Sequence, residues 1–240
     1  MKSLSHVSSP SASQAGNVIF YILIAVTLLA ALSFAVSQSG RGSVSQLSEE
    51  KARLYATEII EFGNTMASGV AQLRLRGVAL SDVCFDHARW GASDYNHAGC
   101  TDNTHRLFHP DGAGLVWAQA PAEAMDSAAT PDDLWHIYAD NEIKNIGTTT
   151  GNASGADLIV LVDELSLSVC RQINDMLGLS ASGATPPVDT LYGTTRYTGT
   201  FSYTATIGDE DAVLDGKLSG CFQKTTAPAK YAFYKVLQAR

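Results

Sequence analysis

An uncharged apolar run near the N-terminus constrains this chain more than any other feature. Residues 18–36 (VIFYILIAVTLLAALSFAV) form a run of 19 residues whose only polar side chains are Tyr21, Thr27 and Ser33. A helix rises about 1.5 Å per residue, so a helix of this length matches the apolar core of a bilayer, about 30 Å thick. The flanking tracts are rich in Ser, Gln and Gly and lack the pattern of an amphipathic core helix. We therefore expect a transmembrane helix over residues 17–38.

Three fates are open to this segment: an uncleaved anchor, a removed secretory signal, or an apolar helix that is kept after a short leader is cut off. A secretory signal has an apolar core of about 7–15 residues followed by a small-residue cleavage site. Ser33-Phe34-Ala35 is a candidate for such a site. The length of the run and the weakly charged leader favour retention of the helix.

A short polar leader precedes the run and ends in SQAG at Gly16, and Asn17 then leads directly into the apolar residues. This arrangement resembles the type IV pilins and the type II secretion pseudopilins. The resemblance implies a leader over residues 1–16, cleavage between Gly16 and Asn17, and retention of the apolar helix on the mature subunit. The family usually begins its mature chain with Phe or Met and has Glu at the fifth position, where this chain has Asn17 and Tyr21. Some tip subunits lack that Glu, so the resemblance implies a minor or tip-type subunit.

A second resemblance covers short blocks in the rest of the chain. These are FHPDG at 108–112, DGK at 215–217, GCF at 220–222 and YKVL at 234–237. They are similar to blocks in uncharacterised bacterial membrane-anchored proteins, a group that implies no activity.

Cysteine usage indicates which side of the membrane holds the bulk of the chain. Cys84, Cys100, Cys170 and Cys221 all follow the apolar run, an even number in an acidic domain. Such usage is typical of disulfides in an oxidising compartment. Pairing Cys84 with Cys100 and Cys170 with Cys221 closes two loops, although four cysteines allow three pairings. We expect a single-pass inner-membrane protein with a cytoplasmic N-terminus and its bulk in the periplasm or at the cell surface.

The charge balance excludes one class of partner. The chain has 16 Lys and Arg against 24 Asp and Glu, a formal net charge of −8. Nucleic-acid binding needs clustered basic residues that displace counterions from phosphates, and this chain has no such cluster. Lys2 is the only charged residue before Arg41, so the acidity belongs to the part that follows the run.

Beyond the run, the sequence predicts a flexible break over 39–47, an amphipathic helix over 48–78 and an extracytoplasmic domain over 79–240. Apolar residues recur in the helix at spacings of three and four, a pattern typical of a helix that packs on its own domain. This stripe consists of Tyr55, Ile59, Phe62, Met66, Val70 and Leu73.

The predicted fold class is α+β: a long N-terminal helix, half membrane and half amphipathic, packed on a mixed helix and antiparallel-sheet domain with a pilin-like outline. Apolar patterning predicts strands over 115–118, 134–138, 157–162, 200–207 and 231–237. It also predicts a helix over 164–177, capped by Asp163.

Two groups of residues are weak candidates for metal binding. Cys84-x2-His87 and His97-x2-Cys100 offer the ligand types that zinc prefers, but an oxidising compartment favours a disulfide between the two cysteines. Asp209 and Asp211 lie in an acidic loop that fails the calcium-loop pattern of the EF-hand.

No catalytic motif is present in the sequence, and we predict a structural or interaction subunit rather than an enzyme, without a cofactor. Its expected partners are the membrane and other pilin or pseudopilin subunits of a filament or secretion apparatus. The alternative is a membrane-anchored periplasmic domain that acts alone, as a ligand-binding module or a metal-dependent hydrolase.

Overall fold

The computed structural model describes residues 15–91, 94–127, 133–179 and 184–240, and it describes the side chains of 19–33 and of the residues after 47. The chain divides into two compact units, Met1–Ser48 and Glu49–Arg240, and each is described by itself. Helix α1 (Ala15–Leu75) contributes to both units. Its helical backbone includes residues 39–47, where the sequence predicts a flexible break, and that break stays a prediction.

The part of α1 that belongs to the larger unit, residues 49–75, packs on the rest of that unit through a seven-residue repeat of buried positions. These positions are Ala52, Ala56, Ile59, Gly63, Met66, Val70 and Leu73, separated alternately by four and three residues. Tyr55 and Phe62, which the predicted stripe includes, are half-buried beside them. The prediction that this helix packs on its own domain is confirmed.

Five strands form one sheet in the order β3-β1-β2-β5-β4. Their bounds are β1 Trp135–Ile143, β2 Asp157–Leu165, β3 Ala205–Ile207, β4 Ser219–Thr226 and β5 Ala229–Gln238. Neighbouring strands are antiparallel except β3, which runs parallel to β1. The sheet is therefore mixed, which corrects the antiparallel sheet predicted from the sequence.

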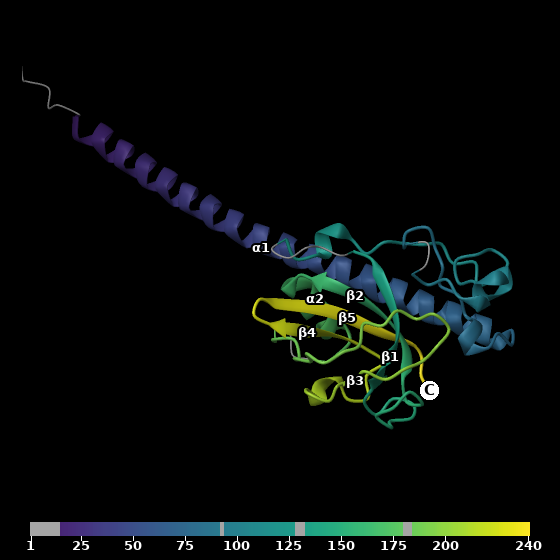
Figure 1. Ribbon diagram of the computed structural model, residues 1–240. Helices are drawn as coiled ribbons and strands as arrows, with labels where there is room; N and C mark the ends of the chain where they lie inside the picture. The colour runs from purple at the N-terminus through teal and green to yellow at the C-terminus, as the bar shows by residue number, and fades with distance from the viewer. Residues whose placement is uncertain (1–14, 92–93, 128–132, 180–183) are drawn as a thin grey trace, which may run out of the picture. The chain divides into compact units, whose positions relative to one another are not determined.

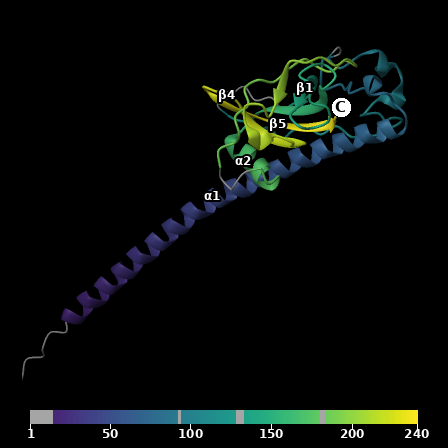
Figure 2. The ribbon, with the colours of Figure 1, turned by 90° about the horizontal axis from the view of Figure 1, so that it is seen from below.

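Each face of the sheet carries its own core. On one face, Trp135, Val160 and Phe233 pack with the buried side chains of α1 and of helix α2 (Leu167–Met176). In Figures 1 and 2, the part of α1 after residue 49 runs along this face. On the opposite face, Tyr138, Leu161, Phe222 and Tyr234 form a second core, which Tyr192, Ile207 and Leu214 extend.

Several predicted elements have different bounds in the structure. Strand β2 continues through Leu165, so α2 begins at Leu167 with Ser166 as its N-cap, and Asp163 does not cap a helix. Residues 115–118 form no strand, and of residues 200–207 only Ala205–Ile207 do. Five short 3-10 helices lie in the connections: Leu80–Asp82, Ala98–Thr101, Asn103–His105, Ala122–Ala124 and Ala212–Leu214.

A search of the described residues for membrane spans finds no helix that is both long enough and apolar enough to cross a bilayer.

Candidate functional site

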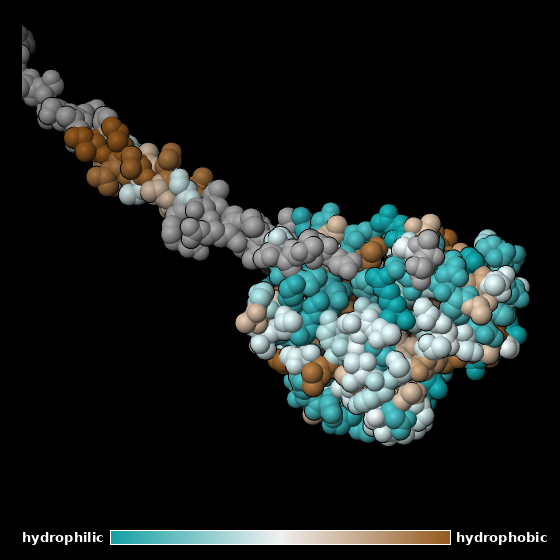
Figure 3. Space-filling model, viewed as in Figure 1, coloured by the Kyte–Doolittle hydropathy of each residue, from teal (hydrophilic) through white to brown (hydrophobic). Residues whose placement is uncertain are grey.

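The first unit presents a helix whose described side chains are all exposed. Ten large apolar or aromatic side chains between residues 19 and 33 have exposed fractions from 38% to 71%: Ile19, Phe20, Tyr21, Ile22, Leu23, Ile24, Val26, Leu28, Leu29 and Leu32. We call these ten side chains the apolar helix surface, and in Figure 3 this stretch of the helix is mostly brown. Contiguous apolar surface on this scale marks an interaction with a membrane or with other apolar protein surfaces.

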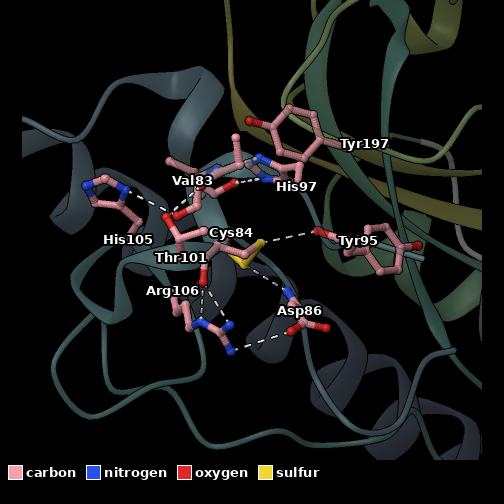
Figure 4. Close-up of a disulfide and its surroundings, with 12 residues drawn as sticks. Val83, Cys84, Asp86, Tyr95, His97, Thr101, His105, Arg106 and Tyr197 are labelled. Atoms are coloured by element: carbon pink, nitrogen blue, oxygen red, sulfur yellow. Dashed lines mark hydrogen bonds and ion pairs between the residues drawn. A yellow bond between two sulfur atoms is a disulfide. The ribbon is translucent and has the colours of Figure 1, made fainter. Parts of the chain in front are cut away.

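The first disulfide joins Cys84 to Cys100 in the loop-rich region that follows α1. Arg106 donates hydrogen bonds from Nε and Nη2 to the Cys100 carbonyl oxygen, at 3.0 and 2.8 Å. Its Nη1 lies 3.5 Å from Oδ2 of Asp86, so one guanidinium connects both sides of the bridge (Figure 4). The disulfide and this arginine together brace a region that has little regular secondary structure.

The two histidines that flank these cysteines have other contacts. In His97, Nε2 lies 3.1 Å from the carbonyl oxygen of Val83, and Nδ1 accepts a hydrogen bond from the Gly99 amide. His87 stacks on Trp117 with ring centroids 5.0 Å apart, and burial lowers the pKa of its imidazole. Both thiols are used in the disulfide, and among the described residues no three His, Cys, Asp or Glu side chains are grouped to hold a metal ion.

The carboxylates of the predicted acidic loop serve separate local contacts. Oδ1 of Asp209 lies 3.1 Å from Nζ of Lys144, an ion pair at the surface. Oδ1 of Asp211 accepts a hydrogen bond from the Val213 amide and so caps a 3-10 helix. The structure does not bring these two aspartates together as a cation site.

The second disulfide fastens α2 to the sheet. It joins Cys170 on α2 to Cys221 on β4. The buried side chain of Asn174 reinforces it, because Nδ2 donates to the Cys221 carbonyl oxygen at 2.7 Å and Oδ1 accepts from the Cys221 amide at 2.8 Å. The two disulfides pair Cys84 with Cys100 and Cys170 with Cys221, the pairing considered from the sequence. Two disulfides are typical of a periplasmic or extracellular domain.

A groove of about 330 Å³ lies between α1 and residues 118–121. Phe62 and Trp135 form an aromatic floor, with ring centroids 5.3 Å apart, and Glu58 and Glu61 line its exposed edge. An apolar floor with an acidic edge suits a basic side chain, which buries its aliphatic stem and leaves its charge at the rim.

A group of charged side chains at one end of β2 and β4 is not predicted by the sequence: Asp163, Glu164, Lys224 and Lys230. Asp163 and Glu164 were expected at the start of a helix, and β4, which carries Lys224, was not predicted at all. The one available signal was the Ser166-Leu167 pair, a better helix start than Asp163-Glu164 because a serine side chain caps the first turn well.

Comparison with known proteins finds no relative for this chain. No family model matches it, and neither does a curated protein or a solved structure. Residues 1–14 of the predicted leader lie outside the described residues, and of Gly16 and Asn17 only the helical backbone is described.

Proposed function

We propose that this protein is a membrane-anchored, pilin-like or pseudopilin-like structural subunit of a filament or secretion apparatus. The apolar helix surface carries the proposal, because ten large side chains exposed along one helix need an apolar environment to cover them. The uncharged run of 18–36 fits the lipid bilayer as that environment before assembly, and the apolar helices of other subunits after it.

The construction of the larger unit supports a role outside the cytoplasm. Its two disulfides need an oxidising compartment to form and persist. The half of α1 that belongs to this unit is built into its core. In the proposed subunit, the domain makes contacts in the periplasm or at the cell surface, and its groove beside Phe62 offers one place for a neighbouring chain.

Processing of the N-terminus tests the proposal. Protein extracted from membranes should begin at Asn17, as determined by N-terminal sequencing and intact mass. A Gly16→Leu variant should keep its leader, because the residue before the cut is then too large for the peptidase that the pilin resemblance implies. Gly42→Leu is the matched control, since it changes a glycine outside the leader, and it should be processed normally.

Two results would contradict the pilin-like assignment. Wild-type protein that keeps Met1 favours an anchored domain that acts alone. A chain that starts near Val36 shows instead that the apolar run is a removed secretory signal.

A further inference from the structure

Two carboxylates and two lysines form a compact group at one end of β2 and β4. Nζ of Lys224 lies 3.0 Å from Oδ1 of Asp163 and 3.0 Å from Oε1 of Glu164. Nζ of Lys230 also lies 3.0 Å from Oε1 of Glu164. The side chains of Asp163, Glu164 and Lys224 are 14%, 9% and 10% exposed, whereas that of Lys230 is 30% exposed. The first three are therefore almost enclosed, and Lys230 stands at the edge.

The strand arrangement explains how Lys224 reaches Asp163. Strands β2 and β4 are not neighbours, because β5 lies between them. The residue of β5 that faces the second core at this level is Ala232, whose small side chain leaves room for contact across the strand. The pairing of β2 with β5 shifts register between Val162 and Leu165, and that of β4 with β5 shifts at Lys224.

The backbone is unusual at the same place. Glu164 has a φ of 58°, in the left-handed region that residues with a side chain rarely adopt. Such conformations persist where the surrounding structure holds them, and they concentrate at sites that do chemistry. Here the conformation accompanies the register shift of β2 that brings Asp163 and Glu164 to the same lysine.

The surroundings leave the pair little exposed to solvent. Phe222 and Tyr138 belong to the second core, and the Tyr192 side chain is hydrogen-bonded to Lys224. Burial raises the pKa of Asp163, although the charge of Lys224 opposes that shift. Burial is the largest single influence on the pKa of Lys224 and lowers it, but the charge of Asp163, together with Tyr192 and the hydrogen bonds to both carboxylates, raises the pKa overall. The reaction requires the proton of the Lys224 ammonium to pass to the Asp163 carboxylate, which converts the ion pair into a neutral amine and a neutral acid, the form that burial favours.

We propose that Lys224 and Asp163 join in an intramolecular amide bond, with Glu164 as the catalytic carboxylate that carries protons between them. The inference does not depend on the filament role, since it concerns only the fold of the larger unit.

The reaction needs no oxidant, reductant or cofactor. After the proton transfer, the lone pair of Lys224 Nζ attacks Cγ of Asp163, and a nitrogen–carbon bond forms. Glu164 accepts a proton from the nitrogen and delivers it to a hydroxyl group on Cγ. The carbon–oxygen bond then breaks, and one water molecule leaves. Fixing the amine 3.0 Å from the carboxyl makes the step intramolecular, which raises the effective concentration of the reactants.

The contacts indicate which of the two carboxyl groups the amine attacks. Oε1 of Glu164 lies 3.0 Å from the ammonium groups of both Lys224 and Lys230, and a carboxylate held between two cations is a poor electrophile but a good proton carrier. Its Oε2 is buried without a hydrogen-bond partner among the described residues, so this oxygen is free to take a proton. Asp163 contacts Lys224 but no second lysine, and burial favours its protonated and reactive form.

Peptide mass spectrometry of the full-length protein, purified from membranes in detergent, tests the proposal directly. Trypsin cuts after Lys144, Arg171, Lys217 and Lys224, so Asp163 lies in peptide 145–171 and Lys224 ends peptide 218–224. An amide on Lys224 blocks cleavage there and should leave peptide 145–171 joined to 218–230. The joined species should be lighter than the sum of the two peptides by one water molecule. Reduction and alkylation must precede digestion, because the Cys170–Cys221 disulfide links the same two peptides.

Three variants test the assigned roles. Lys224→Arg keeps the positive charge but cannot form this amide, so the joined peptide should disappear. Glu164→Gln should slow its appearance about a hundredfold or more, since a positioned proton carrier contributes roughly that factor. Lys144→Arg is the matched control, because Lys144 pairs with Asp209 at the surface, away from this group, and the change keeps the tryptic site and should leave the joined peptide unchanged. Mapping of the Cys170–Cys221 disulfide without reduction reports whether each variant has folded.

The wild-type measurement needs no variant, and it is decisive. Separate peptides 145–171 and 218–224 of full mass, in reduced wild-type protein, overturn the proposal and leave a buried ion pair. If the joined peptide forms in Glu164→Gln as fast as in the wild-type protein, the role of Glu164 is overturned.

Discussion

An amide between Asp163 and Lys224 changes how much the Cys170–Cys221 disulfide stabilises the fold, and a double-mutant cycle can measure that change. Alone, the disulfide spans 51 positions of the chain, and a loop of that length corresponds to about 4 kcal/mol of unfolded-state entropy. With the amide in place, the unfolded chain is already closed nearby. The disulfide then closes a ring of only about a dozen residues, which corresponds to about 3 kcal/mol.

The cycle compares removal of the disulfide, by Cys170→Ala with Cys221→Ala, in the wild-type and the Lys224→Arg backgrounds. The loss of unfolding free energy should be larger by about 1 kcal/mol in the Lys224→Arg background. Urea unfolding of the detergent-solubilised protein, followed by circular dichroism, provides the four free energies. Packing lost with the two sulfurs is the same in both backgrounds and cancels from the comparison.

The first disulfide supplies the control for this cycle. Cys84 and Cys100 are separated by 16 positions, so their bridge is expected to contribute about 3 kcal/mol. It shares no loop with the amide, and its removal should cost the same in both backgrounds. Equal losses for the Cys170–Cys221 bridge in the two backgrounds would refute the reasoning.

Gly63→Ala should raise the melting temperature, because helix propensity improves by about 1 kcal/mol and the new Cβ makes an ordinary van der Waals contact with Phe233, whose Cε1 would lie 3.4 Å away. Gly63→Leu should destabilise by about 1–3 kcal/mol through overpacking, and equal melting temperatures for the two variants would contradict the close contact. Burial raises the pKa of both Asp157 and Asp189 to about 6, above the ordinary 3.8, so the folded state binds more protons between these values and stability should be lost as pH rises through this window. Asp189→Asn should flatten this dependence in urea unfolding measured from about pH 4 to pH 7, and an unchanged slope would contradict the assignment.

The features that the sequence predicts well are those with a local pattern. The amphipathic helix was visible because its apolar residues recur at three and four, and Ile59, Met66, Val70 and Leu73 are all fully buried in the structure. The disulfide pairing that closes the two shortest separate loops is the one found. In both cases, the spacing of the residues along the chain is enough to suggest the contact.

The features that the sequence does not predict depend on strand pairing. Strand β4 (SGCFQKTT) has two adjacent apolar residues and no alternation, and it is a strand because β5 pairs with it. Asp163 and Glu164 look like the first turn of a helix, yet pairing with β5 keeps them in β2. Lys224 lies far from Asp163 along the chain, so their contact emerges only from the order of the strands.

The seven-residue repeat of buried positions has a mechanical consequence for the half of α1 that belongs to the larger unit. A strict repeat would allow the helix to slide by two turns and bury an equivalent set of positions, but the side chains differ in size. Such a slide would bring Val70 to the place of Gly63, where Cβ alone already touches Phe233 and Lys235 of β5, so the two further methyl groups would press on these side chains. This segment therefore has one axial position, and a pull along it is transmitted to β5 as shear rather than relieved by slippage.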